Sequence, residues 1–243
     1  MNVLVIANSF GDDANRYLHQ IARAAGVDIQ VCTLFIGGCT LDMHYRNLLG
    51  NRQAYDMRFN GHITGFKVSI EEALLSREWD VVTIQQGSRK SYKPDSYEPY
   101  AATLTDCIHE CAPKAKLLVH QTWAYKEGSD HLLNLTPYTT FDAMFADIEK
   151  AYDHCVKLVD ADGLIPGGKL MQELLHKGVA CIHRDNLHVT KGLGRYALAL
   201  LWFRLLTGKS VLDNTFRDFD EPVSDEEIAL AKSCVEAYTP IFQ

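Results

Sequence analysis

The feature that most constrains the fold is an alternation of short apolar runs with amphipathic segments. Four runs are rich in β-favouring residues and have the length of strands buried on both faces: Val3–Ala7, Ile29–Phe35, Val81–Gln85 and Lys116–Gln121. Strands that alternate with helices form right-handed crossovers, and the helices then cover both faces of a parallel sheet. The sequence therefore predicts an α/β fold whose ligands bind at the carboxyl ends of the strands.

Helical spacing and capping signals place the helices. Asp12–Ala25 has apolar residues at helical spacing and stops before Gly26, which predicts one continuous helix. Ser69 and Glu72 form a capping-box pattern that opens a second helix. Further helices are predicted at Tyr97–Cys111, Thr139–Val159, Lys169–His176, Lys191–Leu206 and Ser224–Tyr238. The polar segment Asn51–Lys67 interrupts this rhythm, and its Asn60-Gly61 turn signal indicates a small hairpin.

Length, composition and charge exclude several classes of protein. A chain of 243 residues with 47% hydrophobic and 23% charged residues fits one globular domain spanning residues 1–243. The 24 basic and 31 acidic side chains give a net charge of −7, which disfavours nucleic acid as a partner. The apolar stretch Tyr196–Leu206 is shorter than the ~20 residues that span a bilayer, so we expect a core helix and no membrane partner.

The cysteines and histidines give no sign of a metal site. Seven cysteines, an odd number, are scattered without C-x-x-C spacing, and no histidine pair has HExxH-like spacing. We therefore expect free thiols and no metal. The N-terminus enters the first strand without a targeting pattern, so we expect cytoplasmic residence, with secretion left open.

A candidate nucleophile, Ser9, follows the first predicted strand directly. The turn between this strand and its helix puts a hydroxyl at the carboxyl edge of the sheet, beside a helix N-terminus whose unpaired amides can stabilise an oxyanion. A lone serine in such a turn more often caps the helix. Ser9 therefore needs partners before a catalytic role is argued.

The partners lie near the other end of the chain, where Asp185 and His188 are three residues apart. A serine hydroxyl is a weak nucleophile until an imidazole takes its proton, and a carboxylate orients that imidazole. This spacing lets the two side chains meet within one loop. His183 is a competing candidate for the base.

Two loops offer donors for an oxyanion hole, and a third offers an aromatic residue. Gly38 lies after the second strand, where the backbone can come close to a ligand, and Gln86 lies after the third, where its side-chain amide could donate. A tight turn and a loop-bracing glutamine are the alternative interpretations. Trp123, after the fourth strand, is a candidate to line the pocket and stack on a sugar.

These blocks together resemble the SGNH, or GDSL-like, hydrolase family, in order and over essentially the whole chain. They are Asn8-Ser9-Phe10, Ile36-Gly37-Gly38-Cys39, Gln85-Gln86-Gly87-Ser88 and the D-x-x-H of Asp185 and His188, and they are similar to an uncharacterised branch of that family. The resemblance implies a three-layer α/β/α flavodoxin-like fold with a five-stranded parallel sheet. It also implies hydrolysis of carboxylic esters, often acetyl groups on carbohydrates.

The resemblance also assigns roles to residues. It makes Ser9 the nucleophile and Asp185 and His188 the rest of a triad. Gly38 and Gln86 would complete the oxyanion hole with the Ser9 amide. Gln86 stands where the family usually has asparagine, and the first block reads N-S-F-G rather than G-D-S-L.

Two other functions remain open at this point. A nucleotide- or flavin-binding module would use the same architecture, but no G-x-G-x-x-G or Walker A motif follows a predicted strand, so we expect no cofactor. A non-catalytic carbohydrate-binding protein would also retain the fold.

Overall fold

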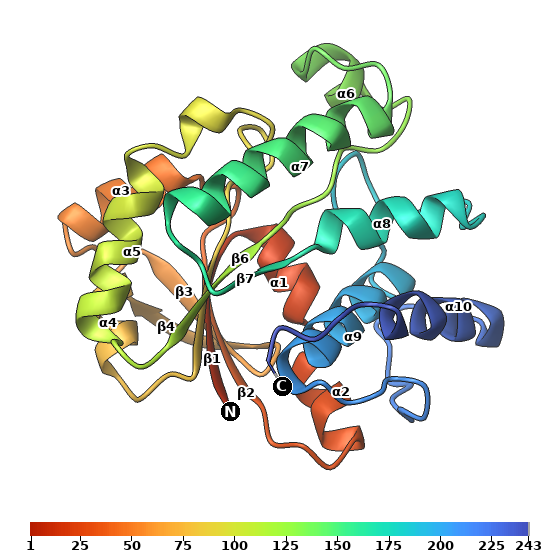
Figure 1. The fold of residues 1–243 in the computed structure, drawn as a ribbon, viewed down its shortest axis with the longest axis horizontal. Helices are drawn as coiled ribbons and strands as arrows, with labels where there is room; N and C mark the ends of the chain where they lie inside the picture. Colours follow the sequence, from red (N-terminus) through yellow and green to blue (C-terminus); the bar gives the residue numbers. More distant parts are fainter. Residues whose placement is uncertain (243) are drawn as a thin grey trace.

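The computed structural model describes residues 1–242 and is built around one seven-stranded sheet in the order β4-β3-β2-β1-β5-β6-β7 (Figure 1). The strands are β1 (Asn2–Ala7), β2 (Gln30–Phe35), β3 (Tyr55–Phe59), β4 (His62–Val68), β5 (Val81–Ile84), β6 (Lys116–His120) and β7 (Gly163–Ile165). β2, β1, β5, β6 and β7 are parallel, and all but β7 coincide with the four predicted runs.

The prediction of a purely parallel, five-stranded sheet is wrong for the whole sheet, which is mixed. The segment expected to be a separate hairpin forms β3 and β4, and β3 pairs antiparallel with β2 from Cys32↔Phe59 to Phe35↔Asp56. This pairing satisfies the backbone groups on the outer side of β2, which would otherwise be an open sheet edge. The hairpin therefore extends the sheet.

Helices cover the sheet on both faces, which gives three layers (Figure 1). One face carries α3 (Leu41–Leu49), α4 (Ile70–Leu75), α5 (Tyr100–Cys111) and α7 (Phe141–Leu158). The other carries α1 (Ser9–Asn15), α2 (Leu18–Ala24), α8 (Gly167–His176), α9 (Leu193–Thr207) and α10 (Asp225–Glu236). The short helices η1 (Pro94–Ser96) and α6 (Asp130–Leu135) lie in the loops after β5 and β6.

The predicted continuous helix Asp12–Ala25 is two helices in the structure, because side chains at the junction bond elsewhere. α1 begins earlier, at Ser9, and ends at Asn15. The buried Asn15 side chain donates to the Gly11 carbonyl one turn back, and bonds of this kind compete with the helical ladder. Tyr17, at the junction, donates its hydroxyl to the Lys191 carbonyl at 2.6 Å. The Asn15 bond is local and the Tyr17 bond is tertiary, and together they interrupt the helix.

The stretch predicted to be a core helix is α9. Buried apolar side chains lie on all sides of α9, which is typical of a helix surrounded by other elements, and α9 packs against α1, α2, α8, α10 and β7. Within residues 1–242, none of the helices combines the length and the apolar character required to cross a membrane.

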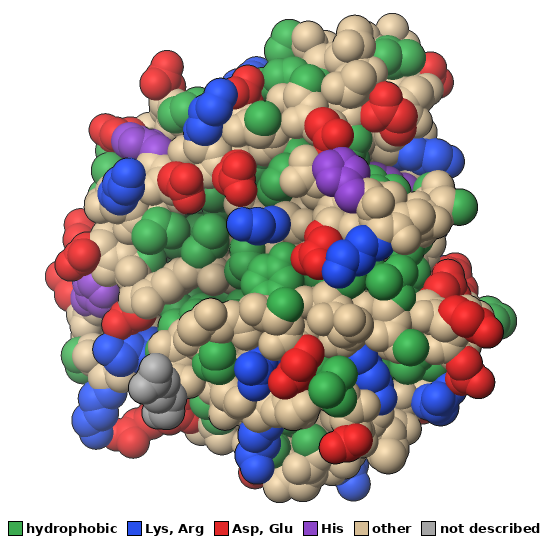
Figure 2. Space-filling view, turned by 45° about the vertical axis from the view of Figure 1, so that its right-hand side comes forward, with side chains coloured by type: hydrophobic (Ala, Val, Ile, Leu, Met, Phe, Trp, Pro, Cys, Tyr) green, Lys and Arg blue, Asp and Glu red, His purple; other side chains and the backbone are tan. Residues whose placement is uncertain are grey.

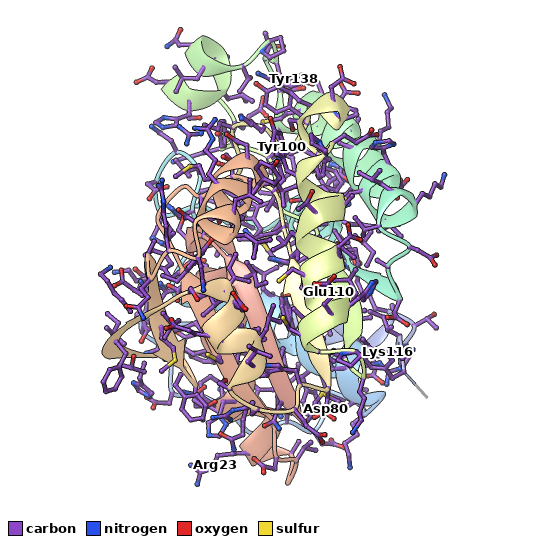
Figure 3. The ribbon with its side chains drawn as sticks, turned by 90° about the vertical axis from the view of Figure 1, so that its left-hand side faces the viewer. Arg23, Asp80, Tyr100, Glu110, Lys116 and Tyr138 are labelled. Atoms are coloured by element: carbon purple, nitrogen blue, oxygen red, sulfur yellow. The ribbon has the colours of Figure 1, made fainter. Side chains whose placement is uncertain are left out.

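The two ends of the parallel strands lie at opposite ends of the molecule (Figure 3). Asp80 and Lys116, at the starts of β5 and β6, are at one end, and Tyr138, in the loop after β6, is at the other. The βα loops that should carry the site are therefore at the Tyr138 end. Figure 2 shows basic side chains dispersed among acidic ones over the face that it presents.

Candidate active site

Ser9 is the first helical residue after β1, and the preceding residue holds it there. Asn8 has an extended backbone and caps α1, because its side chain accepts a hydrogen bond from the Phe10 amide at 2.9 Å. Gly11 allows this turn to pack closely, since a Cβ at that position would lie 2.6 Å from the Gln85 side-chain oxygen. Ser9 remains half-buried, with its hydroxyl at the carboxyl edge of the sheet.

Ser9, His188 and Asp185 form one continuous chain of hydrogen bonds. The Ser9 hydroxyl lies 2.9 Å from Nε2 of His188, and Nδ1 of His188 lies 2.8 Å from Oδ2 of Asp185. A carboxylate can only accept, so Nδ1–H donates to Asp185 and the neutral ring accepts the Ser9 proton at Nε2. The structure therefore brings together three residues that are 179 positions apart at the extremes.

The Asp185 carboxylate is held ionised by its own loop. Burial by itself would raise its pKa, but hydrogen bonds from the amides of His188 and Leu187, and from the His188 ring, outweigh burial and lower the pKa to about 2. The two amide nitrogens lie 2.7 and 2.9 Å from Oδ1 of Asp185. Oδ2 is thus left for the imidazole.

A tight reversal of the chain shapes this loop. His183 and Val189 pair as an isolated antiparallel bridge, and the Arg184 amide donates to the His188 carbonyl at 2.9 Å. His183, the competing candidate for the base, is buried, and its Nε2 bonds the Ala124 carbonyl at 3.0 Å. Burial lowers the pKa of His183 to about 4. His183 therefore supports the loop and does not contact Ser9.

Trp123 is not on the pocket wall, and this corrects its predicted role in stacking on a sugar. Its side chain is 0% exposed, because the ring stacks on Phe10 with centroids 4.3 Å apart. Its indole N–H donates to the Leu187 carbonyl at 2.8 Å. Phe10 in turn lies 5.9 Å from the His188 ring, centroid to centroid. Trp123 therefore joins the Ser9 turn to the His188 loop from beneath.

An ion pair anchors the same loop to α1. Arg184 donates to the carboxylate of Asp13 at 2.9 Å and also to the Val189 carbonyl. Asp13 is 1% exposed, and its carboxylate also accepts a hydrogen bond from the guanidinium of Arg195 at 2.8 Å. A buried carboxylate needs such pairing. Sequence reasoning missed Asp13, because nothing in the local pattern indicates partners 171 and 182 residues away.

Two backbone amides are free to serve an oxyanion. Within residues 1–242, neither the Ser9 amide nor the Gly38 amide has a hydrogen-bond acceptor. Gly38 is exposed and has a φ of +62°, a left-handed conformation that glycine adopts readily. Asn8 ties the two loops together, since its side-chain amide donates to the Cys39 carbonyl at 2.8 Å.

The predicted contribution of the Gln86 side chain to the oxyanion hole is contradicted by its contacts. Gln86 is 0% exposed, and its amide nitrogen donates to the Ser96 carbonyl and hydroxyl at 3.0 and 3.1 Å. Its side-chain oxygen accepts from the amides of Leu41 and Gly87. The alternative interpretation, a loop-bracing glutamine, is the one that the structure supports.

The neighbouring Gln85 is a second brace that sequence reasoning did not identify. Its amide nitrogen donates to the Asn8 side chain at 2.8 Å, and its oxygen lies 3.0 Å from Nδ1 of His120. His120 is fully buried, and burial lowers its pKa to about 3. The sequence shows only that a polar residue stands at the end of a buried strand. This pattern does not distinguish a residue that donates to the substrate from one that holds loops together.

A separate hollow lies at the other end of the molecule. Its volume is about 560 Å³, and its lining includes Arg16, Gln20, Arg23, Asn60, His62 and Asp220. Figure 3 shows Arg23 at the end opposite Tyr138, so this hollow is away from the βα loops that carry Ser9. Within the described residues, no group of three His, Cys, Asp or Glu side chains is placed to hold a metal ion.

The fold is that of the SGNH hydrolases, as comparison with solved structures shows. A candidate SGNH hydrolase from Slackia heliotrinireducens is 21% identical, covers 84% of this chain and 97% of its own, and gives a TM-score of 0.59. A candidate GDSL-like lipase from Parabacteroides merdae is 13% identical, covers 84% and 94%, and gives a TM-score of 0.56. At these identities the likeness concerns the fold.

Within this fold the chain belongs to the family described as domain of unknown function DUF4886, whose model matches residues 2–239. The crystal structure of a DUF4886 protein from Bacteroides uniformis is 31% identical, covers 97% of this chain and 93% of its own, and gives a TM-score of 0.88. No curated protein matches. The predicted resemblance to an uncharacterised SGNH-like branch is therefore confirmed for the fold, and the family is DUF4886.

Proposed function

We propose that this chain is a serine esterase that hydrolyses small carboxylic esters, short acyl groups such as acetyl on a carbohydrate or similar small molecule. The observation that carries the proposal is the hydrogen-bond chain from Ser9 through His188 to Asp185, with links of 2.9 and 2.8 Å. A hydroxyl, an imidazole and a carboxylate in this order are the parts of an activated nucleophile. The SGNH fold of the chain supports the same reaction class.

The proposed reaction proceeds in two steps. His188 takes the proton of Ser9 as the hydroxyl oxygen attacks the ester carbonyl, and the amides of Ser9 and Gly38 stabilise the oxyanion. His188 then gives the proton to the departing alcohol, which leaves an acyl-Ser9. Water, deprotonated by His188, attacks the acyl group, and His188 returns that proton to the Ser9 oxygen as the acid leaves. Asp185 stays ionised and stabilises the imidazolium, which agrees with its lowered pKa.

The test combines covalent labelling with ester hydrolysis. We expect a fluorophosphonate probe to label the wild-type protein and Ser233→Ala, in which an exposed serine of α10 is removed, but not Ser9→Ala. We also expect hydrolysis of p-nitrophenyl acetate to exceed that of the butyrate and octanoate and to be lost in Ser9→Ala and His188→Ala. Equal turnover by wild type and Ser9→Ala would reject the proposal and favour a ligand-binding module.

A further inference from the structure

Three basic residues near Ser9 or His188 have acidic partners: Lys90 and Arg184, which lie on loops, and Arg46, which lies in α3. The Asp42 carboxylate forms ion pairs with Nζ of Lys90 at 2.7 Å and with Nη2 of Arg46 at 3.4 Å. Arg184 is paired with the buried Asp13. Arg89 is different, because it is exposed and, within residues 1–242, forms no ion pair. Its positive charge therefore remains available to a ligand.

Arg89 lies against the loop that carries the proposed oxyanion donor. Its Nη2 approaches the Gly38 carbonyl at 3.4 Å and the Met43 sulfur at 3.8 Å. The residue after Gly38 is bonded to Asn8, which precedes Ser9. The guanidinium is thus next to the place where the ester carbonyl would react.

The loop that carries Arg89 is held by a neighbouring loop. The hydroxyls of Ser88 and Tyr125 lie 3.2 Å apart, which holds the loop after β5 against the loop after β6. Burial raises the pKa of the Tyr125 hydroxyl, and the nearby Arg89 charge opposes this shift. Arg89 therefore extends from a braced loop. Lys126 also forms no ion pair within the described residues, but it lies on the loop after β6, where its amide donates to the Asn186 carbonyl at 2.9 Å, and its ammonium forms no hydrogen bond to the Gly38 loop.

We propose that Arg89 binds a carboxylate on the alcohol portion of the ester, so that the substrate is an acylated hydroxy acid or sugar acid. This inference rests on the proposed esterase function. A guanidinium offers two parallel N–H groups that match a carboxylate. An acetyl group carries no ionisable group, so in an acetate ester the carboxylate belongs to the alcohol portion. The net charge of −7 disfavours the binding of anions in general, and the positive charge of Arg89 offsets that repulsion locally.

The test compares two acetate esters that differ in one charge. The anionic ester is 4-acetoxybenzoate and the neutral one is its methyl ester, and the measured quantity is the ratio of their kcat/KM values. We expect Arg89→Gln to lower this ratio about tenfold or more, because a charge-assisted hydrogen bond is lost. Arg89→Lys should restore part of it. Arg46→Gln is the control, since it removes the same charge from the neighbouring helix α3 and should leave the ratio as in wild type.

Each other outcome overturns the inference. An unchanged ratio in Arg89→Gln means that Arg89 does not bind the carboxylate. An equal loss of kcat/KM for both esters in Arg89→Gln means that Arg89 supports the site in another way. A fall of the ratio in Arg46→Gln as large as in Arg89→Gln means that any nearby positive charge has the same effect and that Arg89 has no specific role. Hydrolysis of neither ester by wild type, with no fluorophosphonate label on Ser9, rejects the esterase proposal and this inference with it.

Discussion

Two loops of the site were predicted to present polar side chains to the substrate. The first prediction came from the three-residue spacing of Asp185 and His188, and the second came from the position of Gln86 after a strand. The loop of residues 183–189 presents Asp185 and His188 at the surface, with side chains 47% and 23% exposed. The loop of residues 85–88 instead turns Gln85 and Gln86 inward, where both are buried and fully bonded to protein. A polar residue after a strand is therefore ambiguous, and its exposure decides whether it meets substrate or braces the scaffold.

The largest effect should come from the exposed loop. Asp185→Asn should lower kcat by roughly 10³- to 10⁴-fold, because an amide cannot fix the imidazole tautomer or stabilise its charged form. The measurement is p-nitrophenyl acetate hydrolysis, with Asp130→Asn, a nearby exposed carboxylate, as the control. A decrease in kcat of less than tenfold would mean that Asp185 only supports the loop and does not act in a catalytic triad.

The buried loop should respond in stability rather than in catalysis. Gln86→Ala removes the partner of the buried amides of Leu41 and Gly87, so the free energy of unfolding should fall by about 2–4 kcal/mol. The folded variant should keep kcat within about tenfold of wild type. Gln53→Ala, at an exposed site, is the control for denaturant unfolding. A drop of 10²-fold or more in kcat without loss of stability would mean that the Gln86 side chain does contribute to the oxyanion hole.

The aromatic brace between the two regions should give an intermediate result. Trp123→Phe should cost about 1–3 kcal/mol of stability and lower kcat several-fold, because the bond to the Leu187 carbonyl beside His188 is lost. Trp202→Phe is a matched control, since the buried Trp202 N–H has no acceptor within the described residues. If KM alone rose in Trp123→Phe, the original interpretation as a substrate-stacking residue would be correct.

The smallest effect concerns acid stability. The ordinary Asp pKa of 3.8 is lowered to about 2 for Asp185 in the folded protein, so the unfolded chain binds this proton more tightly. The stabilisation is present above about pH 4 and is lost as the pH falls through 2. The difference in Tm between wild type and Asp185→Asn should therefore shrink from pH 5 to pH 2. A constant difference over this range would contradict the assignment.

The sequence by itself determined four of the five parallel strands, most of the helices and the Asp185–His188 pair. These depend on local information, because apolar runs form buried strands, helical spacing forms helices, and two side chains three residues apart meet without the rest of the fold. The capping box at Ser69 and Glu72 is a further case, and the structure contains both of its bonds.

Only the tertiary structure decided which polar residues are buried and what they contact. The break between α1 and α2, the pairing of β3 with β2, and the inward positions of Gln86 and Trp123 all depend on partners distant in sequence. No local pattern records those partners. The contact of Ser9 with His188 belongs to the same class, since the sheet brings the two loops together and their spacing in the chain does not.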